Sequence, residues 1–245
     1  MSELHLGVMD RSYAEGRRKR AYLRWRYCVR ARYAADRFRD RRPDRTGPLR
    51  VLEMGAADGR TLLEMRALLG GDGVFEGLEL QPDLIDEAPP LPSNVRLVCG
   101  DVMAPPETFE RGSYDLIAAL ALLEHLPDPL ACVRAAYDLL APGGVFVASC
   151  PHPVWDEIAG ALRMVADEHH EDHMTGDKMR RLAEEAGFER CETEPFMWAP
   201  VGVLPYANLW VSPARALEID ARVRRLGPLG KPGFVNQGLV AQKPR

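Results

Sequence analysis

The sequence predicts an α/β protein, a three-layer sandwich in which helices cover both faces of a mostly parallel sheet. From residue 49 onward, short apolar runs alternate with segments of helical length. Such alternation is typical of parallel strands joined by crossover helices. The chain has 245 residues, of which 46% are hydrophobic and 28% are charged. This length and composition allow one large buried core and disfavour a disordered or fibrous protein.

Residues 11–40 are predicted to form a basic helix. Four residues recur every three or four positions and share one helical face: Tyr22, Trp25, Val29 and Tyr33. Arginines surround this stripe, and residues 1–50 hold 15 Lys/Arg against 6 Asp/Glu, a net of +9. Because a Pro- and Gly-containing linker follows, we interpret residues 1–42 as a basic helical extension that closes over the site as a lid. Docking on the chain's own acidic remainder and contact with an anionic partner stay open as alternatives.

Seven strands are predicted after the linker, in a domain spanning residues 43–245. Each is a short apolar run of the kind found in buried strands. The runs are 49–54, 74–80, 95–101, 114–120, 144–150, 188–196 and 234–243. Helices are expected at 61–71, from Asp128 to about 140, and at 177–187, with a further helix within 199–232. In such sheets a ligand binds beyond the carboxyl ends of the strands.

The end of the first predicted strand carries the main motif. Glu53 is followed by Gly55 and Gly59 where the chain turns from strand into helix. Glycine permits unusual dihedral angles there and lets a ligand approach the backbone. The spacing is not that of a dinucleotide-binding GxGxxG, because residue 57 is alanine, and the loop lacks the GK[ST] of a phosphate-binding loop.

The ordered motifs resemble those of the class I S-adenosylmethionine-dependent methyltransferases. Their first motif reads acid-x-Gly-x-Gly-x-Gly, and Glu53, Gly55, Ala57 and Gly59 stand at those positions. Ala57 replaces a glycine, so we expect a negative φ there. The resemblance continues through residues 51–150 and a matching helix near residue 186. It implies a Rossmann-like fold with a seven-stranded sheet whose last strand is antiparallel.

The resemblance also implies the cofactor, S-adenosyl-L-methionine, with S-adenosyl-L-homocysteine as product. Glu79 stands where the family's acid holds both ribose hydroxyls, and a carboxylate is suited to accept two hydrogen bonds. Asp101 stands where the family binds the adenine amino group. The implied cofactor-binding set is Glu53, Gly55, Ala57, Gly59, Glu79, Leu80, Asp101, Val102 and Leu120.

Three histidines are candidate general bases. His125 and Glu124 follow the fourth predicted strand, His152 follows the fifth, and His173 lies in a segment with His169 and His170. An imidazole titrates near neutral pH and is suited to remove a proton from an acceptor. A purely loop-bracing role for Glu124 and His125 stays open.

Two segments, 151–175 and 199–232, are expected to form the acceptor side of the site. Trp198, Tyr206 and Trp210 in or beside the second segment either line the pocket or pack the fold. The predicted reaction is in-line methyl transfer to an oxygen, nitrogen or carbon atom of a small or medium-sized metabolite, with an anionic acceptor as one option.

No metal is assigned to the site. The histidine-rich segment contains ordinary ligand types, and the chain resembles RNA 3'-end 2'-O-methyltransferases in their ExxEH metal motif. The first glutamate of that motif is Ala121 here, so the ligand set is incomplete. An RNA methyltransferase and a non-catalytic cofactor-binding module are the alternative functions.

The sequence also favours a cytoplasmic location. No apolar run reaches the ~20 residues of a membrane-spanning helix, and the N-terminus lacks the apolar stretch of a secretory signal. The five cysteines include no CxxC pair, which favours reduced thiols over disulfides. The sequence makes no prediction of oligomeric state.

Overall fold

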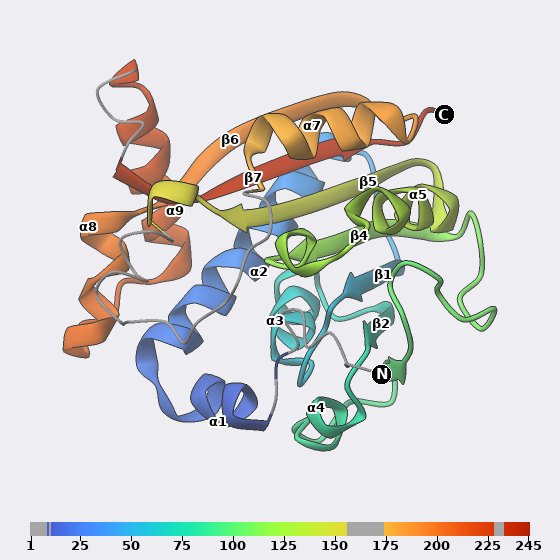
Figure 1. Ribbon diagram of the computed structural model, residues 1–245, viewed down its shortest axis with the longest axis horizontal. Coiled ribbons are helices and arrows are strands. Elements are labelled where there is room, and N and C mark those ends of the chain that lie inside the picture. Colours follow the sequence, from blue (N-terminus) through green and yellow to red (C-terminus); the bar gives the residue numbers. More distant parts are fainter. Residues whose placement is uncertain (1–8, 10, 156–173, 228–232) are drawn as a thin grey trace.

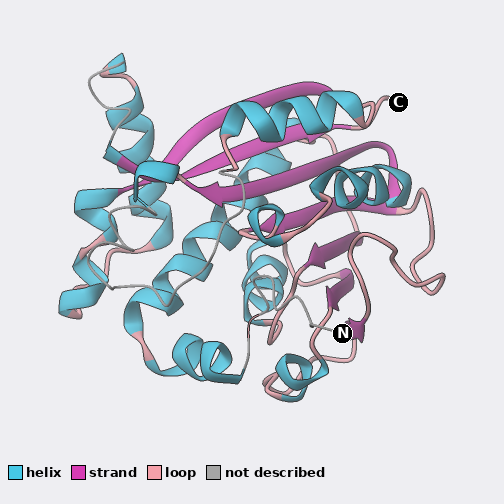
Figure 2. Ribbon diagram, viewed as in Figure 1, coloured by secondary structure: helices cyan, strands magenta, loops and turns pink. Residues whose placement is uncertain are grey.

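A computed structural model describes residues 9, 11–155, 174–227 and 233–245, and its centre is a seven-stranded sheet (Figures 1 and 2). The strand order is β3-β2-β1-β4-β5-β7-β6, and β7 runs antiparallel to both of its neighbours. The predicted α/β class and antiparallel last strand are therefore confirmed. The strands are β1 (Leu49–Met54), β2 (Gly73–Glu79), β3 (Val95–Cys99), β4 (Tyr114–Leu120), β5 (Leu140–Pro151), β6 (Glu189–Trp198) and β7 (Phe234–Gln242).

Helices cover both faces of this sheet. α5 (Pro129–Leu139) and α7 (Gly176–Glu185) lie on one face, and α2 (Ala21–Arg41), α3 (Arg60–Leu68) and α9 (Pro213–Arg224) lie on the other (Figure 1). The remaining helices are α1 (Arg11–Lys19), α4 (Pro82–Asp86), η1 (Leu123–His125), α8 (Ala199–Gly202) and η2 (Leu204–Ala207).

The central strand β4 shows why the sheet needs two helical layers. All seven of its residues are buried. Because side chains alternate along a strand, Leu116 and Ala118 pack toward α2 and α3, whereas Ile117 and Ala119 pack toward α5 and α7. A strand that is buried on both faces has a continuous apolar sequence, and residues 116–120 of β4 show one.

The basic N-terminal region forms two helices rather than the single helix predicted. The chain leaves helical geometry at Arg20, with φ −98° and ψ 118°, between α1 and α2. The two helices pack closely at Gly16, where an added Cβ would lie 2.9 Å from Cδ1 of Leu23. This packing lets α1 turn away from α2 toward α4.

The aromatic stripe of α2 belongs to the core. Trp25 and Val29 have no exposed surface, and Tyr33 stacks on Phe196 of β6 with 4.2 Å between ring centroids. The Trp25 indole also donates a 2.7 Å hydrogen bond to the carbonyl oxygen of Val211. α2 is thus an integral layer of the sandwich, which differs from the separable lid expected from the sequence.

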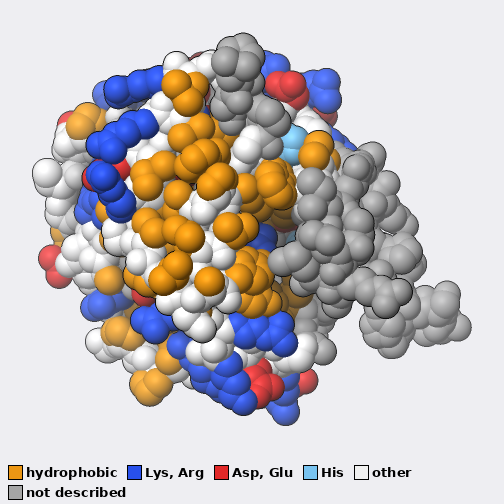
Figure 3. Space-filling model, turned by 90° about the vertical axis from the view of Figure 1, so that its left-hand side faces the viewer, with side chains coloured by type: hydrophobic (Ala, Val, Ile, Leu, Met, Phe, Trp, Pro, Cys, Tyr) orange, Lys and Arg blue, Asp and Glu red, His pale blue; other side chains and the backbone are white. Residues whose placement is uncertain are grey.

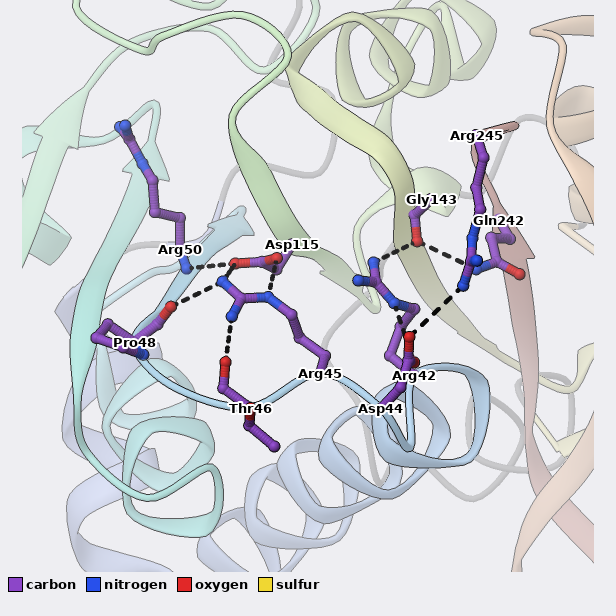
Figure 4. A network of polar contacts seen from close by, with 10 residues as sticks. All are labelled: Arg42, Asp44, Arg45, Thr46, Pro48, Arg50, Asp115, Gly143, Gln242 and Arg245. Carbon is purple, nitrogen blue, oxygen red and sulfur yellow. Dashed lines mark hydrogen bonds and ion pairs between the residues drawn. The ribbon is translucent and has the colours of Figure 1, made fainter.

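The segment that joins α2 to β1 is fixed by arginines (Figure 4). Arg45 donates from Nε to Oδ1 of Asp115 on β4 at 2.7 Å, and Arg42 donates to the carbonyl oxygen of Gly143 on β5 at 2.7 Å. Several of the N-terminal basic residues are therefore engaged within the chain. Docking of the basic segment on its own domain accounts for much of the charge asymmetry in the sequence.

The chain between β6 and β7 forms α8, η2 and α9 against α2, in agreement with the helix expected there. Hydrophobic side chains gather on the face that carries this segment, among basic side chains (Figure 3). Val203, Tyr206, Leu209 and Trp210 are all exposed. In the part of the chain that the structure describes, no helix is long and apolar enough to cross a membrane.

Candidate active site

A cavity of about 420 Å³ lies at the carboxyl ends of β1, β2 and β4. Eight of the nine predicted cofactor residues line it: Glu53, Gly55, Ala57, Glu79, Leu80, Asp101, Val102 and Leu120. Gly59 does not line the cavity. It immediately precedes α3 and has a left-handed φ of 74°. The topology thus gathers residues from the ends of four strands, β1 to β4, into one site, as expected for a parallel α/β sheet.

The loop after β1 reverses direction through left-handed residues. Gly55 has φ 73° and Ala57 has φ 48°, so the expected negative φ at Ala57 is wrong. A left-handed conformation is costly for a residue with a Cβ. Here the amide of Ala57 donates a buried 2.8 Å hydrogen bond to Oε2 of Glu79, which stabilises this conformation.

Glycine at position 55 is required by space as well as by its dihedral angle. A Cβ on Gly55 would lie 2.8 Å from Cδ1 of Leu122. Leu122 follows β4 and lines the same cavity. The glycine therefore lets the β1 loop and the β4 loop approach each other across the site.

Glu79 ends β2 with its carboxylate held by the backbone. Oε2 accepts from the amide of Ala57, and Oε1 accepts from the amide of Gln81 at 3.0 Å. Each carboxylate oxygen can accept more than one hydrogen bond. Glu79 is therefore fixed in place and can still accept from a ligand that carries two hydroxyl groups.

Asp101 follows β3 and is held in the same way. Its Oδ1 accepts a 2.8 Å hydrogen bond from the amide of Met103. The apolar side chains of Val102 and Leu120 lie beside it in the cavity lining. This combination of one acceptor and apolar walls suits a flat heterocycle with an amino group.

Glu53 is the most strongly perturbed acid of the cavity. It is only 2% exposed, and burial raises its pKa to about 8 against the opposing effect of Arg17. Among the described residues, its Oε2 has no hydrogen-bond partner. A buried acceptor without a donor is costly, so this atom fits a positively charged or hydrogen-bonding ligand group.

Arg17 enters the site from α1 and was missed in the sequence. Its guanidinium donates to Oγ1 of Thr61 at 2.6 Å and lies 3.3 Å from Oδ1 of Asp58. It also stacks over the ring of Tyr27, 5.0 Å from the centroid. The arginine is 5% exposed and lines the cavity beside Glu53.

A second buried arginine, Arg30 of α2, lines the cavity from the side of β7. Its Nη2 donates to Oδ1 of Asn236 at 3.2 Å. Helical spacing showed that arginines flank the aromatic stripe, but it did not show which of them faces the site. Position 30 directly follows Val29 of that stripe, and this adjacency was the available signal.

The three candidate histidines have different positions. His125, in η1, lines the cavity. His152 lies just after β5, where its amide donates to the carbonyl oxygen of Val235 at 2.7 Å, and it does not line the cavity. His173 lies outside the described residues, as do His169 and His170.

The aromatic residues of the β6–β7 connection pack elsewhere. Tyr206 stacks on Tyr22 with 4.2 Å between centroids, and Trp210 lies under the guanidinium of Arg24. Neither they nor Trp198 line the cavity. Within the described ranges, no three His, Cys, Asp or Glu side chains are close enough together to hold a metal ion.

This fold and site match the class that the sequence motifs predicted, the class I S-adenosylmethionine-dependent methyltransferases. Residues 20–193 match the methyltransferase domain family. The match covers most of the chain, and the chain belongs to this family.

Comparison with individual proteins agrees with that assignment. The chain is 38% identical over 88 residues to a ubiquinone biosynthesis O-methyltransferase from Psychrobacter arcticus, a match that covers 32% of this chain and 34% of that protein. The match thus spans about a third of that relative's length.

Solved structures show the same fold at low sequence identity. A Haloferax volcanii methyltransferase solved with the Trm112 activator superposes with a TM-score of 0.63, at 18% identity, covering 96% of this chain and 94% of the other. An Archaeoglobus fulgidus SAM-dependent methyltransferase gives a TM-score of 0.58, at 19% identity, covering 87% and 94%.

Proposed function

We propose that this protein transfers a methyl group from S-adenosylmethionine to an oxygen, nitrogen or carbon atom of a small or medium-sized metabolite. One observation carries the proposal: a single cavity joins the acids that end β1, β2 and β3 to a histidine and to two buried arginines. The acids are suited to the cofactor, and the remaining groups extend beyond it.

The cavity offers a complementary group for each part of the cofactor. Glu79 would accept from the two ribose hydroxyls and Asp101 from the adenine amino group. Glu53, with its unpaired buried oxygen, would accept from the ammonium group of the methionine portion. Arg17, next to Glu53, would hold the carboxylate of that portion, since a guanidinium is suited to bind a carboxylate.

When bound, the cofactor supplies an electrophilic methyl group on a sulfonium. The chain itself then needs to orient the acceptor and exclude water, and orientation alone can remove up to ~7–11 kcal/mol of barrier. Leu122, Leu126 and Met103 give the cavity apolar walls near the strand ends. Such walls restrict the acceptor to a few orientations.

His125 is the described histidine placed to take a proton. It lines the cavity from η1, directly after β4. A hydroxyl or amine acceptor loses a proton as its methyl bond forms, and the imidazole would accept that proton. Residues 151–175 and 199–232 remain our proposal for the acceptor side, and residues 1–42 remain our proposal for its cover, as a packed part of the fold that lines the cavity through Arg17 and Arg30.

The contacts of the basic segment favour a small acceptor over RNA. Arg18 pairs with Glu87, and Arg45 pairs with Asp115. Arginines that are paired within the chain release few counterions on meeting a phosphate backbone. The name of the Psychrobacter relative favours oxygen as the methylated atom.

Binding and turnover measured together test the proposal. S-adenosylhomocysteine should bind by calorimetry and stabilise the protein progressively as its concentration rises. Cofactor with a labelled methyl group should label a compound in a metabolite extract, and His125→Ala should lower this labelling without changing cofactor affinity. Binding without any labelling would instead favour the non-catalytic cofactor-binding module.

A further inference from the structure

Arg30 is a buried cation whose donors are incompletely used. It is 8% exposed and lines the cavity. Its one hydrogen bond among the described residues is to the neutral side chain of Asn236, and its Nε is buried without a partner. A buried guanidinium with unused donors is costly unless an acceptor completes it.

Arg26 lies one helical turn earlier on α2 and does not itself line the cavity. Its Nε is buried and has no hydrogen-bond partner among the described residues, and its charge also acts on the hydroxyl of Tyr206. Burial of Arg30 and the nearby charge of Arg26 together lower the pKa of Arg30 to about 10. The two like charges therefore repel each other.

The other arginines of α2 show that this arrangement is specific to one side of the helix. Each of them has a partner on the fold: Arg24 with Trp210, Arg32 with Asp36, Arg37 with Asp40, Arg39 with the Leu68 carbonyl and Arg41 with Glu192. Among the described residues, Arg26 and Arg30 have neither an ion pair nor a cation–π contact, and the one hydrogen bond of Arg30 is to the neutral Asn236.

The remaining charges near Arg30 do not neutralise the pair. Arg17 adds further positive charge, although Asp58 balances most of it at 3.3 Å. Tyr13 and Glu124 act in the opposite direction on Arg30. Glu124 thus supplies negative charge near Arg30, against the positive charge of Arg26 and Arg17.

We propose that Arg30, with the charge of Arg26 beside it, forms a subsite for an oxyanion, a carboxylate or a phosphate monoester, carried by the methyl acceptor. The planar guanidinium presents paired N–H donors that match both groups. The inference rests on the proposed methyl transfer, and it specifies the class of molecule that enters.

The position of Arg30 assigns the subsite to the acceptor rather than to the cofactor. Asn236, its hydrogen-bond partner, lies on β7 opposite Pro151 at the end of β5. The cofactor acids lie at the ends of β1, β2 and β3, with Arg17 beside them. Arg30 therefore approaches the cavity from the side away from the adenine and ribose groups.

Calorimetric titration of the S-adenosylhomocysteine complex tests the subsite without any need for turnover. The probes are benzoate, phenyl phosphate and the neutral isostere benzamide. The variants are Arg30→Met and Arg26→Met, with Arg24→Met as the matched control because it removes the same charge from the same helix at a residue that packs on Trp210. Thermal unfolding reports whether each variant is folded, and S-adenosylhomocysteine affinity is measured separately for each.

At least one anionic probe should bind the wild-type complex about tenfold or more tightly than benzamide. Arg30→Met should remove most of this preference, Arg26→Met should lower it by less, and Arg24→Met should keep it. The affinity of all three variants for S-adenosylhomocysteine should stay within a few-fold of the wild-type value.

Three results would overturn the subsite: no anion binding at millimolar probe, equal binding of benzoate, phenyl phosphate and benzamide, or equal losses in all three variants. A large loss of S-adenosylhomocysteine affinity in folded Arg30→Met would assign this arginine to the cofactor instead. Failure of the wild type to bind S-adenosylhomocysteine would contradict the proposed function itself, so the two failures are distinguishable.

Discussion

The carboxylate of Glu79 and the backbone amide of Ala57 are joined by a 2.8 Å hydrogen bond that is buried in the site. This bond ties the end of β2 to the loop after β1. It also holds Ala57 at φ 48°, a value that alanine rarely adopts. The residue that is expected to bind the cofactor therefore also fixes the shape of the loop beneath it.

Replacing Ala57 by glycine should stabilise the protein. Glycine adopts positive φ without the Cβ penalty, so we expect a gain of up to ~1 kcal/mol in the free energy of unfolding. Ala56→Gly is the control, because that neighbour is buried and has no positive φ. It should lose ~1 kcal/mol, and equal effects in denaturant titrations would contradict the strain at position 57.

Glu79→Gln should weaken binding of S-adenosylmethionine. Loss of hydrogen bonds to a charged group costs ~1.5–3 kcal/mol, measurable by calorimetry. The control is Glu76→Gln on the same strand, since Glu76 faces Arg96 and Tyr114 outside the cavity. That variant should lower stability and leave the dissociation constant unchanged.

Gly55→Val should affect binding more severely than Glu79→Gln. Valine at φ 73° is strained, and its Cβ would meet Leu122 at 2.8 Å. We expect a folded but less stable protein without measurable cofactor binding. Gly202→Ala, with its nearest neighbour atom 3.8 Å away, should bind normally, and normal binding by the valine variant would mean that the site is misplaced.

Trp25→Ala should show that α2 is structural. Truncating a fully buried tryptophan costs ~3–5 kcal/mol, whereas Tyr22→Ala, which loses a stacking contact with Tyr206, should cost ~1 kcal/mol. Deletion of residues 1–42 should likewise prevent folding. A truncated protein that unfolds cooperatively like the full chain would support the separable lid instead.

The raised pKa of Glu53 gives stability a specific pH dependence. Its pKa rises from the usual 4.5 to about 8 on burial, so the folded state binds more protons than the unfolded state between these values. Stability should therefore fall as the pH rises through this window. Glu53→Gln should show a smaller fall between about pH 5 and about pH 8 in urea titrations. Parallel curves for the two proteins would contradict the shift.

The sequence predicted the sheet and its acids because both depend on local patterns. Each strand is a short apolar run, and Glu53, Glu79 and Asp101 follow directly from strand ends. The two arginines escaped prediction because their roles depend on how α1 and α2 pack against the sheet. Spacing placed Arg30 next to the buried stripe but not over the cavity, since that requires the crossing of α2 over β7.

The positive φ of Ala57 also could not be predicted from the local sequence. It depends on the amide bond to Glu79, 22 positions later in the chain. An alanine in this loop therefore becomes compatible with a left-handed turn only when β2 has paired with β1.

The pairing of β6 with β7 bears on how this chain diversifies. The last paired residues of the two strands are Trp198 and Phe234. The residues between them therefore form a connection between two strands that are already paired with each other. The entropy of closing such a connection grows slowly with its length. Evolution can therefore lengthen, shorten or replace the α8–α9 region while the sheet and the cofactor acids persist, and the selectivity of related enzymes can drift there with little cost to the fold.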